Sequence, residues 1–258
     1  SANQVSATGI VVLPTALIVS VPGEGGSQTS VSIAGTSQLR LEQVDEVFLV
    51  ATDAIDGRLR ATDGLARLTA ARERAPSFGL IPRTAGHVVL TVGLCMILGG
   101  SGLDLIVSAI LGAAVGTARL STRSLTFSYQ VFLPVLSAFG VTVIVLLLPR
   151  AGLSVGILAP LIAPLVMFLP GALLTTSAIE LATGQMVSGA SRLAAGGMQL
   201  ALLALGIIAG TQLVGVPAGA LRSASPLGEL APWVGVALFG AGVVVHQCAR
   251  RQSVGWIL

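Results

Sequence analysis

The chain has 258 residues, of which 53% are hydrophobic and only 10% are charged, and its mean hydropathy is +0.92. Because about 25% of the residues of a soluble globular domain are charged, this composition excludes an ordinary soluble globule. All 14 basic residues are arginines, and with 11 acidic residues they give a net charge of +3. The arginines follow the apolar segments rather than one patch, so they do not indicate nucleic-acid binding.

Charge divides the chain into two parts. Residues 1–83 hold seven of the arginines and eight of the acidic residues. Residues 84–258 hold only three acidic residues, Asp104, Glu180 and Glu229. The expected fold class is therefore an α-helical polytopic membrane protein that carries a small N-terminal α+β cytosolic domain over residues 1–83.

The N-terminal domain is expected to combine strands and helices. Residues 9–22 form two β-rich runs around Pro14, residues 29–35 form a third, and GEGGSQ at 23–28 is a turn signal. From Leu41 the apolar residues recur with a helical period, and Asp56-Gly57 is a signal for the end of the first helix. Thr62 or Asp63 is the expected cap of a second helix. This pattern favours a positioning or assembly domain without chemistry.

Six apolar segments follow, at about 86–101, 103–118, 131–148, 155–175, 195–215 and 231–248. Each approaches the ~20 residues that a helix needs to cross a ~30 Å hydrocarbon core. Backbone groups in lipid must be satisfied within a segment, and no alternating barrel pattern is present, so we expect about six transmembrane helices.

Arginine distribution predicts the sidedness of these spans. Arg72, Arg74 and Arg83 precede the first span, which makes the N-terminal domain cytosolic by the positive-inside rule. With six spans, twelve of the fourteen arginines fall on that same side, with Arg150 and Arg222 on the other. We therefore expect a multi-pass protein of the plasma or inner membrane.

Small residues and isolated polar residues in the spans have structural interpretations. Ser108, Gly112 and Gly116 recur every four residues, and Gly206 and Gly210 form a GxxxG motif, so both sets favour close helix contact.

Cysteines, histidines and one acid in the spans are also interpreted structurally. Cys95 and Cys248 lack metal-ligand spacing and are expected to be packing residues, so no metal site is predicted. His87 and His246 lie at span ends, where an interfacial position is expected. Asp104 is interpreted as a solvated helix cap, with a gating role as the alternative.

One segment, FLPGALLTTSAIELATGQMVSGASRL at residues 168–193, interrupts this pattern. Proline removes a backbone donor and clashes with the preceding turn, so Pro160, Pro164 and Pro170-Gly171 predict kinks or a break. If residues 172–192 are one helix, a polar face follows at intervals of four residues: Thr176, Glu180, Gly184, Ser188 and Arg192.

Broken helices near membrane depth hold substrates and coupling ions in secondary transporters. A carboxylate there must be paired, solvated or protonated, which makes Glu180 the candidate proton carrier. The other candidate substrate-binding or coupling residues are Thr175, Thr176, Gly171, Ser188, Arg192 and Asp104, and the candidate structural break comprises Pro170, Gly171 and Gly184. The alternative is an amphipathic surface helix with Glu180 in water.

The same segment resembles the threonine/serine exporter family (ThrE-like), whose signature is an apolar span, Pro-Gly, an acid, a Gly/Ser stretch and an arginine. Here these residues are Pro170, Gly171, Glu180, Gly184, Gly189 and Arg192. IVVLPTALIVSV and DGRLRATDGLARL also resemble the family, so the resemblance covers about residues 5–220.

The resemblance implies export of threonine and serine driven by the proton motive force. It also implies a five-span membrane domain over residues 84–220, with the interrupted segment at 170–193. Residues 221–258 look like a loop and the first span of a second, truncated membrane half, whose remainder is in cis or on a separate chain.

The preferred hypothesis is thus a proton-coupled secondary exporter whose partners are the amino acid, protons, the lipid bilayer, the second half and a possible homo-oligomer. It needs no cofactor. The alternative is a non-transporting membrane scaffold or regulatory subunit. An enzyme is not expected, because no Walker loop, nucleophile elbow or HExxH motif is present.

Overall fold

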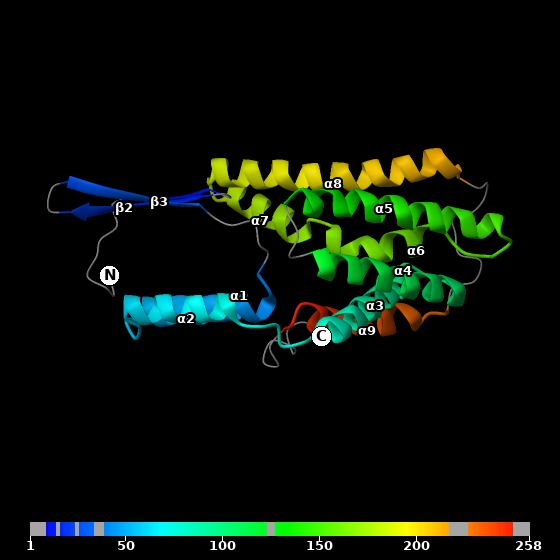
Figure 1. Ribbon diagram of the computed structural model, residues 1–258, viewed down its shortest axis with the longest axis horizontal. Helices are drawn as coiled ribbons and strands as arrows, with labels where there is room; N and C mark the ends of the chain where they lie inside the picture. Colours follow the sequence, from blue (N-terminus) through cyan, green and yellow to red (C-terminus); the bar gives the residue numbers. More distant parts are fainter. Residues whose placement is uncertain are drawn as a thin grey trace. The chain divides into compact units, whose positions relative to one another are not determined.

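The computed structural model describes residues 9–13, 16–23, 26–33, 39–122, 127–216 and 227–249. The chain divides into two compact units, one formed by Ser1–Pro76 with Gly171–Gly196 and the other by Ser77–Pro170 with Gly197–Leu258. Figure 1 labels the elements. The expectations for Pro14, residues 34–35, Arg123, Arg222, Arg250 and Arg251 lie outside the described residues.

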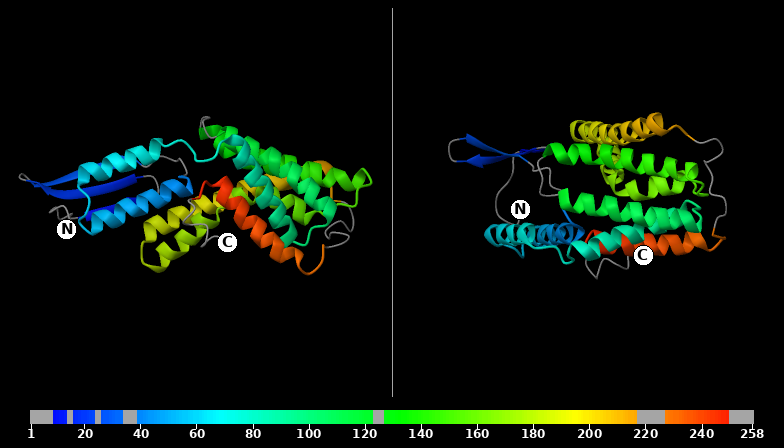
Figure 2. Two further views of the ribbon diagram at one scale, coloured as in Figure 1. Left: turned by 90° about the horizontal axis from the view of Figure 1, so that it is seen from below. Right: turned by 45° about the vertical axis from the view of Figure 1, so that its right-hand side comes forward.

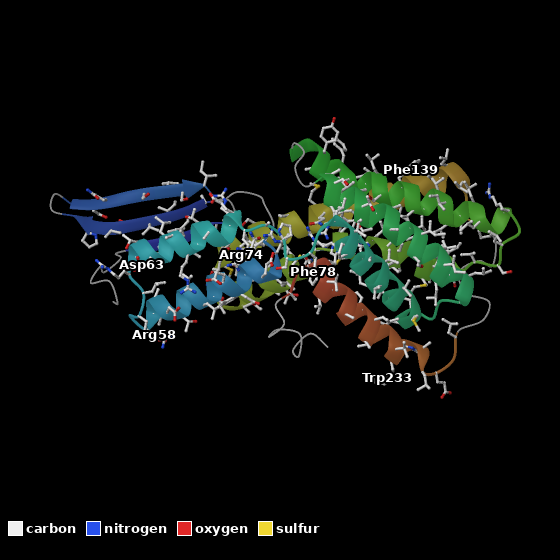
Figure 3. All side chains as sticks on the ribbon, turned by 60° about the horizontal axis from the view of Figure 1, so that its bottom comes forward. Arg58, Asp63, Arg74, Phe78, Phe139 and Trp233 are labelled. Carbon is white, nitrogen blue, oxygen red and sulfur yellow. The ribbon has the colours of Figure 1, made fainter. Side chains whose placement is uncertain are left out.

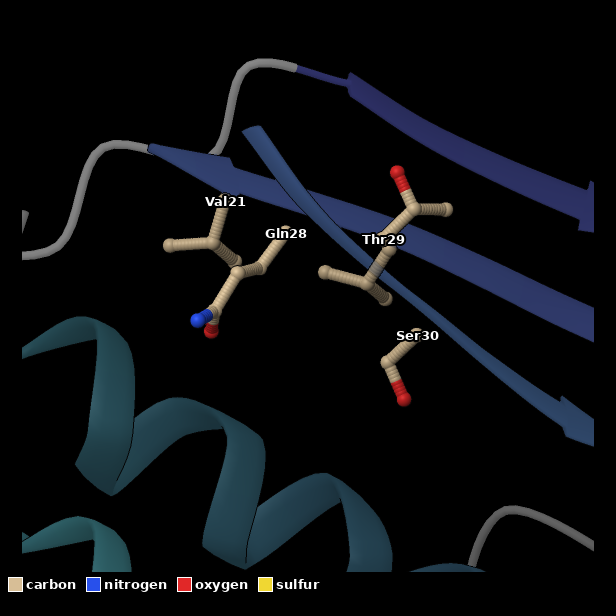
Figure 4. A pocket seen from close by; sticks show the side chains of 5 residues that line it. Val21, Gln28, Thr29 and Ser30 are labelled. Carbon is tan, nitrogen blue, oxygen red and sulfur yellow. The ribbon is translucent and has the colours of Figure 1, made fainter. Parts of the chain in front are cut away.

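Three antiparallel strands form a sheet in the order β1-β2-β3: β1 (Gly9–Leu13), β2 (Ala16–Gly23) and β3 (Gly26–Ile33). The prediction of a turn over residues 23–28 is wrong in length, because Gly23 pairs with Gly26 and the ladder continues through Pro22 and Ser27. Tight connections between paired strands are the commonest form of β-hairpin. A shallow hollow on this sheet is lined by Val19, Val21, Gln28, Thr29 and Ser30, none of which is charged (Figure 4).

Two helices, α1 (Leu41–Ile55) and α2 (Ala61–Glu73), pack against each other. Gln43 joins them by donating to the Ala71 carbonyl at 3.1 Å. The predicted end of the first helix is confirmed, because Asp56 is its C-cap and Gly57 has φ +72°.

The predicted cap of the second helix is wrong. Arg60 precedes α2, and Thr62 and Asp63 lie within its first turn. The negative charge of Asp63 there still stabilises the positive helix end. Figure 3 labels Asp63 and, on the connection between the helices, Arg58.

The second unit is built of α3 (Leu80–Ile97), α4 (Gly102–Ser121), α5 (Phe127–Arg150), α6 (Leu158–Ile162), the 3₁₀ helix η2 (Ala163–Phe168), α8 (Met186–Val214) from Gly197 onward, and α9 (Ala231–His246). Leu111, Val115, Val141, Val145 and Leu161 belong to its apolar core. α3 begins six residues before its predicted start. Proline is tolerated in a first helical turn, as at Pro82, and Arg83 is buried by protein at 6% exposure.

In the described part of the chain, four helices are long and apolar enough to cross a membrane: α3, α4, Val131–Arg150 of α5, and α8. A fifth span results if the bent pair formed by Leu158–Phe168 and α7 (Gly171–Ala182) is counted as one. The expectation of about six spans is therefore not confirmed by the described residues. The predicted fourth span is interrupted after Phe168, and α9 has only 16 residues.

Glycines set the closest helix contacts in the second unit. As the sequence predicted, Gly112 and Gly116 lie against Thr91 and His87 of α3, and a Cβ at either position would approach those side chains within 2.9 Å. Gly206 and Gly210 lie against α5, where a Cβ at Gly210 would be 2.8 Å from Thr142 Cβ. Figure 2 shows α5 and α8 side by side.

Two glycines of α3 and two glycines of α9 form another close helix contact, which was not predicted from the sequence. A Cβ at Gly93 would lie 2.6 Å from the Gly235 carbonyl oxygen, and one at Gly242 would lie 2.7 Å from the Gly86 oxygen. Since Gly86 meets the end of α9 and Gly93 meets its start, the two helices are antiparallel and nearly touch backbone to backbone (Figure 1). Trp233 projects outward from α9 and is 75% exposed (Figure 3).

Candidate functional site

The segment after Pro170 is a helical hairpin in the first unit. α7 ends at Ala182, and α8 begins at Met186. Gly184 has φ +83°, its N–H donates to the Leu181 carbonyl at 3.2 Å, and the next N–H, that of Gln185, donates to the Glu180 carbonyl at 2.8 Å. These bonds form the Schellman motif, which ends a helix at a residue with positive φ. The condition for the four-residue polar face, one helix over residues 172–192, is therefore not met.

The two arms of the hairpin pack closely. A Cβ at Gly189 would lie 2.7 Å from Leu181 Cγ, and one at Gly196 would lie 2.6 Å from Leu174 Cδ2. The hydroxyl of Ser177, which is fully buried, donates to the Gly189 carbonyl at 2.7 Å. This contact fixes the arms relative to each other near the turn.

Glu180 lies between the arms of this hairpin. Ser188 Oγ donates to Glu180 Oε2 at 2.8 Å, and Arg192 Nε lies 3.0 Å from the same oxygen. The side chains of Glu180 and Arg192 are 14% and 28% exposed. We call Glu180, Ser188 and Arg192 the hairpin cluster. The sequence grouped these residues along one helix, but the structure brings them together across a turn.

The remaining predicted residues of this segment lie elsewhere on the hairpin. Gly171 is the first residue of α7 and follows Pro170, where the helical path is interrupted. Thr175 and Thr176 are exposed, whereas the buried hydroxyl in this region is that of Ser177. Gly184 forms the turn instead of a position on a polar face.

Asp104 belongs to the second unit and is fully buried. Its Oδ2 accepts a hydrogen bond from the Ser101 N–H at 2.8 Å, which caps α4, and its Oδ1 accepts from the Gly156 N–H at 2.8 Å. The interpretation as a helix cap holds, but the expectation that the cap is solvated is wrong. The hydrogen bond from the Gly156 N–H joins Asp104 of α4 to the segment that precedes α6.

His87 and His246, whose expected interfacial positions stay a prediction, are enclosed by protein. Both are fully buried, and their rings meet edge to face with centroids 4.9 Å apart. Arg83 Nε donates to the His246 carbonyl at 3.2 Å, and His246 Nδ1 lies 2.9 Å from the Arg83 carbonyl. Arg119 Nη1 approaches His246 Nε2 at 3.2 Å. We call Arg83, His87, Arg119 and His246 the arginine–histidine centre.

The sequence contained part of the signal for this centre. Arg83, His87 and Thr91 recur every four residues, so they share one face of α3. Gly112 and Gly116 face that surface from α4 and leave room for a ring and a hydroxyl. No local pattern places His246, which is 163 residues from Arg83, on the same face.

Comparison with known families identifies the chain. A family model described as "Putative threonine/serine exporter" (ThrE) matches residues 1–214, which is most of the chain. The chain belongs to this family. Neither the search of curated proteins nor the search of solved structures returned a match.

Membership of the exporter family confirms the resemblance that the Pro-Gly, acid and Gly/Ser pattern indicated. The matched residues include the whole hairpin cluster, while α9 and His246 lie beyond residue 214. Members of the exporter family are transporters rather than enzymes. The apolar helices agree with a multi-pass membrane protein.

Proposed function

We propose that this member of the exporter family moves threonine or serine out of the cell in exchange for protons, and that the hairpin cluster binds the amino acid. The supporting observation is that Glu180 Oε2 lies 2.8 Å from Ser188 Oγ and 3.0 Å from Arg192 Nε. A carboxylate, a hydroxyl and a guanidinium thus lie within reach of one small molecule.

These three groups complement a hydroxylated amino acid. In its zwitterionic form the substrate carries an ammonium that pairs with Glu180 and a carboxylate that pairs with Arg192. Ser188 then exchanges its hydrogen bond with Glu180 for one with the substrate hydroxyl. Arg192 Nε forms an ion pair with Glu180 but no aligned hydrogen bond, so a substrate carboxylate that pairs with Arg192 does not have to break one.

Competition for Glu180 couples the two fluxes. The ionised carboxylate attracts the substrate ammonium, whereas a protonated carboxyl has no charge with which to hold it. A proton that arrives from outside therefore displaces the amino acid, and loss of that proton on the cytosolic side restores the binding site. Low exposure of Glu180 strengthens its attraction for the substrate ammonium, because partial burial lowers the local dielectric constant.

The setting of the hairpin fits this role. It follows an interrupted helical path at Pro170, and such breaks carry substrate sites in other secondary transporters. The arginine-rich N-terminal domain is proposed to lie in the cytosol and the spans in the plasma or inner membrane. A second membrane half, in cis or as a separate chain, and a homo-oligomer are the proposed assembly partners.

Counterflow of labelled threonine in vesicles that contain the full-length protein tests the proposal. Wild-type protein is expected to exchange threonine and to respond to an imposed pH gradient. Glu180→Gln is expected to lose the pH response, because the amide cannot carry a proton. Glu229→Gln, a change of the same chemistry at an exposed residue, is the matched control and is expected to behave as wild type.

Two results would contradict different parts of this proposal. An unchanged pH response in Glu180→Gln would remove Glu180 as the proton carrier and leave export intact. Absence of exchange of any small amino acid by the wild-type protein would instead favour a scaffold or regulatory subunit.

A further inference from the structure

The arginine–histidine centre and the adjacent Thr84 contain buried polar atoms that make no hydrogen bond. In the described residues, Arg83 Nη2, Thr84 Oγ1 and His87 Nε2 are buried and have no hydrogen-bond partner. Arg83 is 6% exposed and His87 is fully buried. A buried polar atom without a partner costs roughly 1–3 kcal/mol, and more when it is charged. Three such atoms on neighbouring turns of α3 therefore indicate a place where a polar ligand can bind.

The charge of Arg83 defines the sign of that ligand. Its guanidinium is always protonated, yet its contact here is with a neutral group, the His246 carbonyl at 3.2 Å. No acidic side chain of the described residues forms an ion pair with Arg83. An uncompensated buried cation is strongly unfavourable, so an anion is the expected partner.

The histidine on α9 does not supply this negative charge. A carbonyl can only accept, so His246 Nδ1 donates to the Arg83 carbonyl at 2.9 Å. Arginine can only donate, so His246 Nε2 accepts from Arg119 Nη1 at 3.2 Å. Both contacts together assign the neutral ring with its proton on Nδ1. His246 thus orders Arg83 without neutralising it.

We propose that Arg83 and Thr84, lined by His87 and enclosed by the end of α9 at His246, bind a small oxyanion of the carboxylate or phosphate type. Guanidinium Nη2 offers N–H donors, the Thr84 hydroxyl can donate once, and an oxyanion offers at least two acceptor oxygens. The first turn of α3 also presents the positive end of a helix. The residues of this site belong to the second unit, whereas those of the hairpin cluster belong to the first.

Thermal unfolding of the full chain in nanodiscs of neutral phosphatidylcholine tests the proposal. Sodium acetate and sodium phosphate are titrated at constant ionic strength. A ligand that binds only the folded state raises Tm as its concentration increases. Well above Kd, the rise continues with the logarithm of the ligand concentration. Arg83→Gln is expected to raise the concentration needed for a given Tm shift by at least about tenfold, since it removes a charged hydrogen-bond donor. Thr84→Val, which keeps the side-chain shape, is expected to weaken binding several-fold.

The controls separate this site from the proposed transport site and identify the source of the anion. Arg192→Gln removes any anion binding at the hairpin cluster, and the part of the Tm shift that depends on Arg83 is expected to persist in this variant. Nanodiscs that contain phosphatidylglycerol distinguish a lipid headgroup from a free anion. If the headgroup occupies the site, wild type gains Tm from that lipid, Arg83→Gln does not, and soluble acetate adds nothing further.

The proposal is overturned if neither soluble anion nor the anionic lipid stabilises the wild type in a way that depends on Arg83. If Arg83→Gln does not fold, Thr84→Val decides the question, and equal anion responses of wild type and Thr84→Val count against the site.

Discussion

Arg83 and His246 exchange two hydrogen bonds although 163 residues separate them. Arg83 Nε donates to the His246 carbonyl at 3.2 Å, and His246 Nδ1 donates to the Arg83 carbonyl at 2.9 Å. The end of α9 is thereby joined to the first turn of α3, next to the glycine contact between the same two helices. α9 therefore packs as part of the second unit, even though the family match ends before it.

Replacement of His246 by phenylalanine should loosen α9. The ring volume is nearly kept, but the Arg83 carbonyl loses its donor and Arg119 loses an acceptor. Leaving a buried acceptor without its donor costs about 1–3 kcal/mol, so Tm should fall by several degrees. Thermal unfolding measures this, with Trp233→Phe as the control, because Trp233 is 75% exposed on the same helix. Equal Tm values for the two variants would contradict the assigned hydrogen bonds.

Gly242→Ala should separate α3 from α9. The added Cβ would lie 2.7 Å from the Gly86 carbonyl oxygen, and backbone atoms cannot move aside as side chains can. Overpacking of this kind costs about 1–3 kcal/mol, which exceeds the ~1 kcal/mol that alanine gains over glycine in a helix. Gly140→Ala is the matched control, because a Cβ there meets nothing within 4 Å. It should be neutral or stabilising in the same unfolding assay.

Gly184→Ala should destabilise the turn of the hairpin by roughly 1 kcal/mol, because an L-residue is strained at positive φ. The φ of Gly184 is +83°, and a Cβ there meets nothing within 4 Å, so backbone strain alone is tested. Gly184→Asn should lose less, since asparagine tolerates this conformation. Unfolding and threonine exchange together provide the measurement. A larger loss in the asparagine variant would show that the turn differs from a Schellman motif.

Asp104→Asn should weaken the start of α4. The carboxylate accepts from Ser101 N–H and Gly156 N–H, each at 2.8 Å, with a different oxygen for each. An amide has only one acceptor oxygen, so its NH₂ group would face one of these donors at a cost of about 1–3 kcal/mol. Glu229→Gln is the control, because Glu229 is exposed. If both variants unfold at the wild-type temperature, the two hydrogen bonds of Asp104 do not stabilise the fold as described.

Acid should weaken the pairing of α1 and α2 through Asp53. Hydrogen bonds from Arg67 and then Arg58 hold the pKa of Asp53 below its usual value of 3.8. A lowered folded-state pKa stabilises the fold above pH 3.8, and this contribution is lost as pH falls through the lower folded value. Hydrogen exchange of α1 amides should therefore be faster in Asp53→Asn than in wild type at neutral pH. The difference should shrink below pH 3.8; a difference that persists there would refute the linkage.

Local patterns in the sequence account for much of the fold. Apolar period and length predicted the helices of the second unit, and the Pro170-Gly171 pair marked the point where the helical path is interrupted. Spans are recognisable because lipid demands about 20 apolar residues and internal hydrogen bonding. Span ends were less accurate. Arg83 and His87 are buried by protein, so polar residues are tolerated in the first turns of α3. Hydropathy therefore predicted a start of α3 that is too late in the sequence.

The sequence grouped the three residues of the hairpin cluster correctly, but it predicted the wrong arrangement of the backbone that carries them. Spacing by four residues is the same signal whether Glu180, Ser188 and Arg192 share one helix or meet across a turn. Gly184, which ends α7 in a Schellman motif, decides between these alternatives. The φ of an isolated glycine in a helical pattern cannot be read from the sequence. For the same reason Thr176 was grouped with the cluster, whereas Ser177 holds the arms together.

By itself the sequence determined that this chain is helical and apolar, where its charges concentrate, and which acid follows the break, because these properties depend on residue type and short spacing. Only the tertiary structure decided that His246 faces Arg83 and His87, that Asp104 is buried, and that Gly93 meets Gly235. Such pairings depend on how distant helices pack, and packing is selected by shape and by buried hydrogen bonds that span the chain. No short window of sequence contains both partners.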